Sequence, residues 1–388
     1  MREVRLKDST RQRCQIIQLD DISRQKLMPV SLELFHFLYQ VENLPFSVFC
    51  RIQNTLIEYV KSGPLVKEHL DDLWDLMRRP ETDSDICIRR ADQNAFEHVI
   101  SSIRQIKLSA LSKQLPDLDQ KTLDLFAQLS SASQMIVAGG IDAEVARQVK
   151  ASAAYLVSNA IDSDLIVNTL SRMITCDPTL YDHSATVAML ASAIALRLLP
   201  KKLTTKEAEL VAQCALYHDV GKTCVPNEIL NKPGKFTPAE FEIMKQHTTH
   251  GHLELSKLMA NGVAIDEVVA RVALEHHERW DGSGYPLKKQ GPLEENHETG
   301  IHLFSRIVMI ADVYSALLMK RVYKPAFEPQ EAITIMAKES RGYDPEIFSP
   351  FLKCVVRSLN RTASSSSRLL ILSKDGKLTE WQNTAKSA

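Results

Sequence analysis

The chain has 388 residues, and at roughly 100 to 200 residues per domain this length predicts two or three domains. Its 47 basic and 48 acidic residues give a formal net charge of -1, which excludes a global basic field that would attract nucleic-acid polymers or membrane surfaces. With 44% hydrophobic and 24% charged residues the composition is typical of a globular protein, so an anionic ligand would need a local basic patch.

The N-terminus predicts no secretory signal, because no apolar run follows the basic residues of MREVRLKDSTRQR. The most apolar stretch, residues 185–200, is shorter than the about 20 residues that span a bilayer. Seven scattered cysteines without a C-x-x-C pair fit reduced thiols. We therefore expect a cytoplasmic protein without a membrane partner.

Short β-like runs and amphipathic helical runs alternate along the first hundred residues. The β-like runs cover 46–52, 55–60 and 85–92, and the helical run at 65–79 places four leucines on one face. The segment contains no phosphate-binding glycine loop and no cluster of acids. We predict a small α/β (α+β) domain over residues 1–104 with a sensory, docking, dimerisation or other regulatory role.

Residues 105–172 show helical periodicity throughout, with one helix opening in PDLDQKTLDLFAQL and another in DAEVARQVKASAAYLVSNAI. We predict that this stretch is a helical connector. At the other end of the chain, residues 361–388 begin with a serine run that predicts a linker. The residues after this run fit either a short hairpin with Lys374-Asp375-Gly376 at its turn or a partly ordered terminus.

Residues 173–360 form a further series of amphipathic helical runs, and most of the twelve histidines fall there. Several apolar helical stripes lead to an imidazole or a carboxylate, which predicts that these groups point into one core. Burying five imidazoles and two carboxylates without an ion would leave costly unpaired polar groups, so the pattern favours a shared metal centre over separate hydrogen-bonded residues. The candidate metal ligands are His183, His218, Asp219, His247, His276, His277 and Asp312.

Four further histidines are weaker candidates. His250 and His252 follow His247 closely and either line the site or lie on the surface. His297 and His302 lie in a polar loop, and we expect them to be solvated.

Seven protein ligands exceed the four that a tetrahedral zinc ion accepts, but they suit two divalent ions that share a bridging carboxylate. Asp219, directly after His218, is the candidate bridge and so a candidate catalytic residue. A set of imidazoles and carboxylates without a thiolate favours iron or manganese, with zinc, nickel or cobalt as alternatives. Two such ions can hold a hydroxide and clamp phosphoryl oxygens, which predicts phosphoester hydrolysis.

Polar and aromatic residues near these candidates suit an anionic ligand that carries a base. Lys222 either supplies a cation beside phosphate oxygens or is a solvated lysine that follows the helix stop at Gly221. The turn DGSGYP contains two glycines that would let the backbone approach a ligand. Its Tyr285 would lie at the mouth of the site, where its ring could stack on a base or its hydroxyl could contact phosphate. Arg321 and Lys324 would form the local basic patch just beyond the last of these helices.

The order of these motifs resembles that of the HD-GYP domain, a branch of the HD phosphohydrolase superfamily. His218-Asp219 is followed by VPNEILNKPGKFTPAEFEIMKQH, then by HHERWDGSGYP, then by IADVYSALLMKRVYK, over roughly residues 173–355. The resemblance implies a mostly α chain whose all-helical domain carries a bi- or trinuclear metal centre. It also implies hydrolysis of cyclic di-GMP to pGpG or GMP, in bacterial second-messenger signalling.

The resemblance also implies residue roles. The seven candidates above would be the metal ligands, and Lys222 would assist catalysis. Asp281 and Gly284 would shape the loop that carries the tyrosine. The residues that would bind the cyclic dinucleotide are Tyr285, Arg321, Lys324, Gly284 and Asp281.

This chain departs from the family pattern at two positions. Trinuclear members carry a glutamate one helical turn before the first histidine, and here that residue is Thr179, which favours a binuclear site. The family often has an aspartate after D-x-Y in the last helix, and here that residue is Ser315. We expect the second departure to be tolerated, because Asp312 is the ligand in that helix.

Three hypotheses arise for the function. The first is a cyclic di-GMP phosphodiesterase that is regulated by its N-terminal domain. The second is a cyclic di-GMP sensor or effector with little turnover that docks signalling proteins through the GYP loop or the N-terminal domain, although the intact ligand set argues against it. The third keeps the enzyme but changes its substrate to cyclic GMP-AMP, and a homodimer is compatible with each hypothesis.

Overall fold

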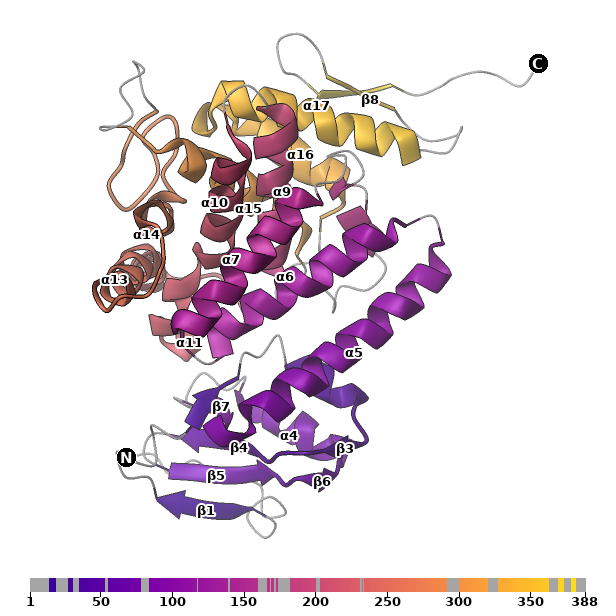
Figure 1. The fold of residues 1–388 in the computed structure, drawn as a ribbon, viewed down its shortest axis with the longest axis vertical. Helices are drawn as coiled ribbons and strands as arrows, with labels where there is room; N and C mark the ends of the chain where they lie inside the picture. The colour runs from indigo at the N-terminus through magenta and orange to yellow at the C-terminus, as the bar shows by residue number, and fades with distance from the viewer. Residues whose placement is uncertain are drawn as a thin grey trace, which may run out of the picture.

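The structure is a computed structural model of the chain. It describes residues 14–18, 27–30, 35–52, 55–77, 84–116, 118–138, 140–159, 166–167, 169–170, 172–173, 182–199, 203–230, 232, 234–291, 300–319, 327–362, 369–372 and 378–381. Figure 1 shows a small sheet region at one end, a larger helical region at the other, and one long helix, α5, that leads between them.

A five-stranded antiparallel sheet forms the N-terminal region, with the strand order β1-β5-β4-β7-β2. In its centre, Cys50 of β4 pairs with Ile57 of β5 on one side and with Ile86 of β7 on the other. Because β-branched and aromatic side chains pack well on a pleated surface, these apolar runs form strands. The strands are β1 (Gln15–Gln18), β2 (Leu27–Pro29), β4 (Val48–Ile52), β5 (Thr55–Val60) and β7 (Ser84–Arg89).

Helix α4 (Lys67–Met77) packs against the sheet at strands β5 and β7. It buries Leu70, Leu73 and Leu76, so the amphipathic helix expected in this stretch is confirmed. The short elements around it are η1 (His36–Gln40), β3 (Asn43–Leu44), which pairs with β6 (Gly63–Pro64), and η2 (Arg90–Asp92).

Helix α5 (Gln93–Gln114) belongs to both regions of the molecule. Phe96 and Ile100 pack into the core of the sheet region, whereas Leu108 and Leu111 pack into the core of the helical region. The boundary expected between residues 104 and 105 therefore falls inside one continuous helix. Periodicity alone did not reveal it, because the apolar positions of α5 serve two different cores and show no single strong stripe.

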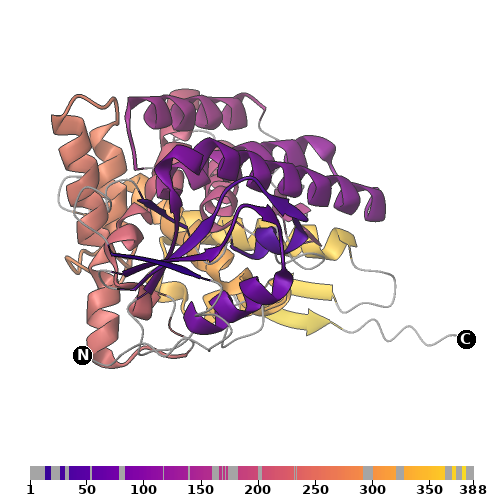
Figure 2. The ribbon, with the colours of Figure 1, turned by 90° about the horizontal axis from the view of Figure 1, so that it is seen from below.

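The helical region is built around α9 (His183–Ala193), which is buried at every position from Ala185 to Ala193. A helix that is buried on all sides belongs in a core, and α6, α10 and α15 pack around it. Figure 2, seen from below, shows the sheet in front of this region, so the two regions are stacked along the long axis. The other helices are α6 (Gln120–Ala138), α7 (Ala143–Ser158), α10 (Thr205–Tyr217), α11 (Asn227–Leu230), α12 (Pro238–Lys245), α13 (His247–Ala260), α14 (Glu267–Glu275), α15 (Leu303–Leu318), α16 (Pro329–Lys338) and α17 (Pro345–Thr362).

Side-chain caps set the starts of helices in the helical region. Oδ1 of Asp182 accepts a hydrogen bond from the backbone N of Ala185 at 3.0 Å and so opens α9 at His183. Thr204 and Glu207 form a capping box at the start of α10. Because the first N–H groups of a helix have no acceptor within the helix, each cap fixes where its helix begins.

The expected fold class, mostly α with a small α/β region ahead of an all-helical region, is confirmed. At the C-terminal end, β8 (Leu369–Leu372) pairs antiparallel with β9 (Leu378–Trp381), which favours the hairpin over the partly ordered terminus. The residues expected at its turn, Lys374-Asp375-Gly376, lie outside the described residues.

Two expectations concern membranes and thiols. No helix in the described part of the chain combines the length and the apolar character that crossing a bilayer requires. Cys176 lies outside the described residues. Four described cysteines, Cys50, Cys87, Cys214 and Cys224, are free thiols, in line with the expectation of reduced thiols.

Candidate metal centre

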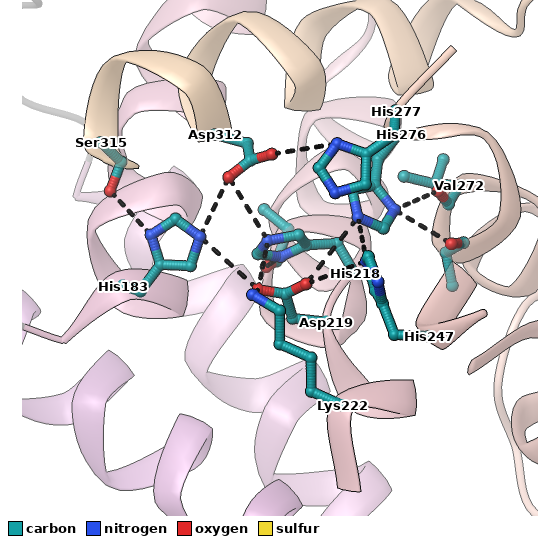
Figure 3. Close-up of polar contacts among 12 residues, drawn as sticks. His183, His218, Asp219, Lys222, His247, Val272, His276, His277, Asp312 and Ser315 are labelled. Atoms are coloured by element: carbon teal, nitrogen blue, oxygen red, sulfur yellow. Dashed lines mark hydrogen bonds and ion pairs between the residues drawn. The ribbon is translucent and has the colours of Figure 1, made fainter. Parts of the chain in front are cut away.

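The ends of four helices, together with one position inside α15, bring the seven candidate ligands to one place. His183 is the first residue of α9, and His218 and Asp219 directly follow α10. His247 is the first residue of α13, and His276 and His277 directly follow α14. Asp312 lies within α15 and completes the group, which Figure 3 shows as one cluster of imidazoles around two carboxylates.

The two carboxylates lie between imidazoles that approach from different sides. Oδ2 of Asp219 lies 3.3 Å from Nε2 of His218 and 3.6 Å from Nε2 of His183. Its other oxygen, Oδ1, lies 3.5 Å from Nε2 of His247 and 3.8 Å from Nε2 of His276. Asp219 thus presents one oxygen to each of two pairs of histidines, which is the arrangement that a bridging carboxylate needs.

Asp312 takes a second position between the histidines. Its Oδ1 lies 3.0 Å from Nε2 of His183 and 3.9 Å from Nε2 of His218. Its Oδ2 lies 3.8 Å from Nδ1 of His277. Both carboxylates therefore face the space into which the imidazole nitrogens point.

Hydrogen bonds from the outer ring nitrogens orient the imidazoles. Nδ1 of His218 donates to the carbonyl oxygen of Ala215 at 2.7 Å, and Nδ1 of His247 donates to that of Met244 at 2.7 Å. Nδ1 of His276 likewise donates to a backbone carbonyl at 2.9 Å. Because a carbonyl oxygen only accepts, each bond places the proton on Nδ1 and leaves a lone pair on Nε2.

His183 is oriented by a side chain instead, since its Nδ1 lies 3.1 Å from Oγ of Ser315. Ser315 is the residue where the family often has an aspartate, and sequence reasoning assigned it no role. In the structure its hydroxyl stands one turn beyond Asp312 and holds the ring that faces that carboxylate. The signal that would have found it is the helical spacing of three residues from Asp312.

Burial and neighbouring charges keep most of these imidazoles neutral and both carboxyls ionised. Burial lowers the pKa of His277 to about 3, and together with neighbouring histidines it lowers the pKa of His276 well below its ordinary value. The pKa of His247 is also lowered, mainly by burial. Neutral imidazoles carry the lone pairs that metal ligation requires.

The carboxyls shift in the opposite sense to what burial alone would cause. Burial would raise the pKa of Asp219, but His218 and Lys222 hold it well below its usual range. Burial would likewise raise the pKa of Asp312, but His183 and other neighbouring imidazoles hold it far below. Burial would lower the pKa of His218, but the neighbouring Asp219 carboxylate outweighs burial and raises that pKa.

Several polar atoms in the cluster lack a protein partner, although the cluster is buried. Among the described residues, neither Nε2 of His218 nor Oδ1 of Asp219 has a hydrogen-bond partner. Nε2 of His247 lies 3.3 Å from Nε2 of His276, so two lone pairs face each other. Buried polar groups normally have partners, and a cation between these nitrogens and oxygens would supply them.

The donor set therefore fits divalent metal ions. Ligand atoms within 4.8 Å of one another occur in three overlapping groups of residues. They are imidazole nitrogens and carboxylate oxygens without a thiolate, the donors that suit ions such as iron, manganese or zinc. The groups are His183, His218 and Asp219, then His247, His276 and His277, then His218, His276 and Asp312.

Lys222 lies beside the cluster, and its Nζ donates to Oδ2 of Asp219 at 2.5 Å. It belongs to the 3-10 turn η5 (Val220–Cys224), which packs against α13. Gly221 makes that packing possible, because a Cβ there would lie 1.9 Å from the carbonyl oxygen of His247. The expectation that Gly221 serves to stop the preceding helix is thus corrected: α10 ends at Tyr217, and the glycine is needed for close contact with α13.

The loop with Tyr285 closes one side of the cluster. The rings of Tyr285 and His277 lie 4.8 Å apart with an angle of 33°, and the backbone N of Tyr285 donates to the carbonyl oxygen of His277 at 3.1 Å. A Cβ at Gly284 would lie 2.3 Å from the backbone N of Arg279, so a glycine is needed here for the loop to pack against its own backbone. Asp281 accepts hydrogen bonds from Oγ and N of Ser283 at 2.6 and 3.1 Å, and it is exposed in the turn.

The remaining sequence candidates are either residues that the structure does not describe or described residues that do not belong to the cluster. Arg321, Lys324, His297 and Thr179 lie outside the described residues. His302 caps α15, since its Nδ1 accepts from the backbone N of Phe304 at 3.2 Å, and the residue is partly exposed. His252 donates from Nδ1 to the carbonyl oxygen of Ala270 at 3.1 Å, and neither it nor His250 belongs to the metal-type groups among the described residues.

Two buried glutamates, which were not among the sequence candidates, hold the loop and the start of α15. Glu278 accepts from the backbone N of Leu287 at 2.6 Å and of Lys289 at 2.8 Å. Glu275 accepts from the backbone N of His302 at 2.9 Å and pairs with Nζ of Lys289 at 2.6 Å. Each is 1% exposed. For Glu275, its position on the buried stripe of α14 is the signal that could have identified it, whereas Glu278 lies beyond the end of that helix, where no helical stripe points to it.

Comparisons with known proteins agree with this geometry. The HD domain family matches residues 168–347. The cyclic di-GMP phosphodiesterase PA4108 of Pseudomonas aeruginosa is 38% identical over 187 residues, which are 48% of this chain and 42% of that protein. A cyclic di-GMP phosphodiesterase of Thermotoga maritima is 38% identical over 189 residues, which are 48% of this chain and 47% of that protein.

A relative with a different named substrate also matches. The 3'3'-cGAMP-specific phosphodiesterase 2 of Vibrio cholerae is 36% identical over 152 residues, which are 39% of this chain and 27% of that protein. The chain spans less than half the length of each of these curated relatives. The family match, over residues 168–347, covers the segment that contains the histidine–aspartate cluster.

Proposed function

Because the HD domain family matches residues 168–347, we propose that the chain is a metal-dependent phosphodiesterase that hydrolyses cyclic di-GMP to pGpG, GMP or both. The observation that carries the proposal is the buried cluster in which the nitrogens of five imidazoles face two ionised carboxylates. The names of relatives at 38% identity support the choice of substrate.

The cluster would hold two divalent ions, with iron or manganese favoured by its donors and zinc, nickel or cobalt as alternatives. His183 and His218 lie on the Oδ2 side of Asp219, and His247 and His276 lie on its Oδ1 side, with His277 and Asp312 completing the set. When bound, such ions supply Lewis acidity that activates water and neutralises charge on phosphoryl oxygens.

The residues around the cluster would bind and orient the substrate. Lys222 is half exposed, and its ammonium group beside Asp219 can donate to a non-bridging phosphate oxygen, where charge builds in the transition state. Tyr285, with its ring over His277, offers a base or a sugar an aromatic surface at the mouth. Arg321 and Lys324 would add positive charge, and Asp281 and Gly284 would hold the loop in shape.

Two alternative functions differ in their support. Hydrolysis of cyclic GMP-AMP is favoured by the relative whose name specifies 3'3'-cGAMP. A sensor or docking effector with little turnover is disfavoured, because all seven ligand-type residues are present and gathered. No nucleic-acid polymer is expected as a partner, since the net charge is only -1.

We further propose that the sheet region regulates the cluster and that the chain divides into a regulatory domain (1–104), a connector (105–172), the phosphodiesterase domain (173–360) and a tail (361–388). Arg104 in α5 supports this coupling. It is 2% exposed, and its guanidinium lies 5.5 Å from the ring of Phe37 in η1. Its charge also acts on Asp182, the residue that caps α9 beside His183. A location in the cytoplasm and a homodimer are parts of the same proposal.

The test is product formation from cyclic di-GMP by protein purified without oxygen and reconstituted with Fe(II) or Mn(II), with metal counted on the same sample. We expect conversion to pGpG or GMP, and its loss in His276→Ala. Nucleotide affinity and about two bound ions without turnover would favour the sensor, and no affinity would point to another nucleotide.

A further inference from the structure

A row of aromatic rings leads from the metal centre to the protein surface. The ring of Tyr285 lies 4.8 Å from that of His277 and 6.2 Å from that of Phe241, which it meets edge to face at 79°. Phe241 is 44% exposed, so the row ends in solvent. An exposed ring beside a catalytic cluster is a surface on which a flat, apolar part of a ligand can pack.

The ammonium group of Lys245 stands over this row. Its Nζ lies 5.4 Å from the centre of the Phe241 ring and 5.7 Å from that of the Tyr285 ring. Its ion pair with Glu242, at 2.7 Å, involves a carboxylate that is 68% exposed and is therefore easily exchanged for another acceptor. A lysine donates hydrogen bonds but accepts none, so the row combines two rings with a donor-only cation.

Helix α12 carries both new residues and is fixed mainly at its ends. Its carbonyl at Met244 accepts from Nδ1 of His247, which ties its C-terminal end to a candidate metal ligand. Thr237 and Glu240 form a capping box at its start, and Glu240 also pairs with Lys232 at 2.5 Å. None of the residues in this fully described helix is buried, so its side chains are available to a ligand rather than committed to a core.

We propose that Phe241, Tyr285 and Lys245 form a nucleobase subsite in which one purine base of the cyclic dinucleotide stacks on Phe241 while Lys245 donates to the acceptor edge of that base. This inference rests on the proposed function, and it concerns how the site around the metal cluster selects its substrate. A flat purine can stack on the aromatic rings of this subsite, and the anionic dinucleotide is attracted by the cation of Lys245.

The donor-only character of Lys245 gives the subsite a base preference. Guanine presents two acceptors, O6 and N7, on one edge, whereas adenine presents N7 beside the N6 donor. A lysine placed at this edge therefore favours guanine over adenine. Lys245 is assigned as a residue that determines specificity between cyclic di-GMP and 3'3'-cGAMP.

Substitutions at Phe241 test the stacking. Base stacking on an aromatic ring typically changes affinity by roughly ten-fold or more, so Phe241→Ala is expected to raise KM and Kd for cyclic di-GMP by about that factor. Phe241→Tyr should restore binding, whereas Phe241→Leu, which keeps apolar bulk without a ring, should not. Leu253→Ala, at another exposed apolar position (49%), is the matched control and should leave KM unchanged.

Two outcomes would overturn the stacking role. One is a Phe241→Ala variant that folds, by its circular dichroism, and keeps the wild-type KM and Kd. The other is full restoration by Phe241→Leu, which would show that bulk rather than a ring is needed.

Lys245→Met tests the base preference, with Lys257→Met in the exposed last turn of α13 as its control. The ratio of kcat/KM for cyclic di-GMP to that for 3'3'-cGAMP is expected to fall by roughly three- to ten-fold in Lys245→Met and to stay constant in the control. An equal loss for both substrates would contradict the preference, because it would indicate a general charge effect.

The wild-type protein separates failure of the subsite from failure of the proposed function. If the metal-loaded wild type hydrolyses cyclic di-GMP while the Phe241 and Lys245 variants match it, only the subsite is wrong. If the wild type neither binds nor hydrolyses either dinucleotide, the proposed function is wrong and the subsite falls with it.

Discussion

Two groups of buried polar side chains meet at the C-terminal end of α14, and their polar atoms are satisfied in different ways. Glu275 accepts hydrogen bonds from the backbone N of His302 and the hydroxyl of Ser305, and it pairs with Arg271 and Lys289. One residue later, Nε2 of His276 faces Nε2 of His247. Neither nitrogen carries a proton, because both rings donate from Nδ1 to backbone carbonyls.

The difference separates a structural cluster from one that needs a ligand. A buried carboxylate that accepts several hydrogen bonds from the protein has no further requirement, so the Glu275 cluster is complete as it stands. The cluster around Asp219 contains buried acceptors that face other acceptors, so it is complete only with cations. Adjacent residues in the sequence, Glu275 and His276, thus have different roles because their side chains leave the helix end on different sides.

Removing the carboxylate that joins the two halves of the histidine cluster should have the largest effect. Asp219→Ala is expected to lose both metal ions and to lower kcat/KM by more than about 10³-fold, because the ions lose their shared ligand. Metal content and turnover measure the effect, and far-UV circular dichroism should show the helices retained. Full metal stoichiometry in this variant would rule out the bridge.

The control for that variant is Asp124→Ala, which removes an exposed carboxylate of α6 that accepts a hydrogen bond from the side chain of Gln120. It should keep both metal content and kcat/KM. Loss of metal in the control would mean that the measurement reports general destabilisation rather than the cluster.

A substitution at Glu275 should have the opposite effect, because the protein should lose stability but keep its metal. Glu275→Gln is expected to lower the free energy of unfolding by about 2–3 kcal/mol, because it leaves charged and hydrogen-bonding partners of a buried carboxylate unmatched. Urea unfolding of the metal-free protein measures this, with the exposed Glu267→Gln of the same helix as control. Loss of metal from the folded variant would contradict a purely structural role.

Comparing the wild type with Glu275→Gln also predicts how the contribution of Glu275 to stability depends on pH. Burial alone would raise the pKa of Glu275, but Lys289, the N–H of His302 and Arg271 outweigh it, so the folded pKa lies below the unfolded value of about 4.3. Such a carboxyl stabilises the fold above that pH and loses its contribution as the pH falls through the folded pKa. The stability difference between wild type and Glu275→Gln should therefore be constant above about pH 5 and shrink below about pH 4.

Taking the difference between the two proteins removes the titration of the histidine cluster, which both contain. Urea unfolding at about pH 7, 5 and 4 is sufficient for the measurement. A stability difference that grows on acidification would show that the sign assigned to the Glu275 shift is wrong.

A smaller effect is expected at the hydroxyl that orients His183. Ser315→Ala removes the partner of Nδ1 of His183, and the loss of such an outer hydrogen bond typically weakens metal affinity by about ten-fold or somewhat more. Ser315→Asp supplies another acceptor and should keep affinity near that of the wild type. Competition with a chelator measures both, and an unchanged affinity in Ser315→Ala would show that this hydroxyl does not support the metal centre.

The gathering of ligand-type residues could be anticipated because apolar helical stripes lead to them, six at a helix end and Asp312 inside α15. His183, His218 and His276 show this pattern, and burial of the stripe carries the imidazole into the core with it. The fold class could be predicted from the same periodicity. The apolar periodicity and the residue types were therefore enough to predict which residues gather in the cluster.

The features that the sequence did not reveal depend on contacts between distant segments. Gly221 and Gly284 are needed because other backbone lies within 2.5 Å of where a Cβ would be, and no local pattern reports such a neighbour. The capping role of His302 depends on where α15 starts, after a stretch whose composition is that of a polar loop. Two partners of Glu275, Lys289 and the backbone N of His302, lie 14 and 27 residues away along the chain, so these hydrogen bonds are a property of the fold.

The central claim is that the cluster around Asp219 holds two ions that share its carboxylate. The most direct measurement is a crystal structure of anaerobically prepared protein loaded with Mn(II), with anomalous scattering to locate the metal. A shared carboxylate predicts two peaks about 3.5 to 4 Å apart, one on each side of Asp219. A single peak, or peaks that do not contact Asp219, would contradict it.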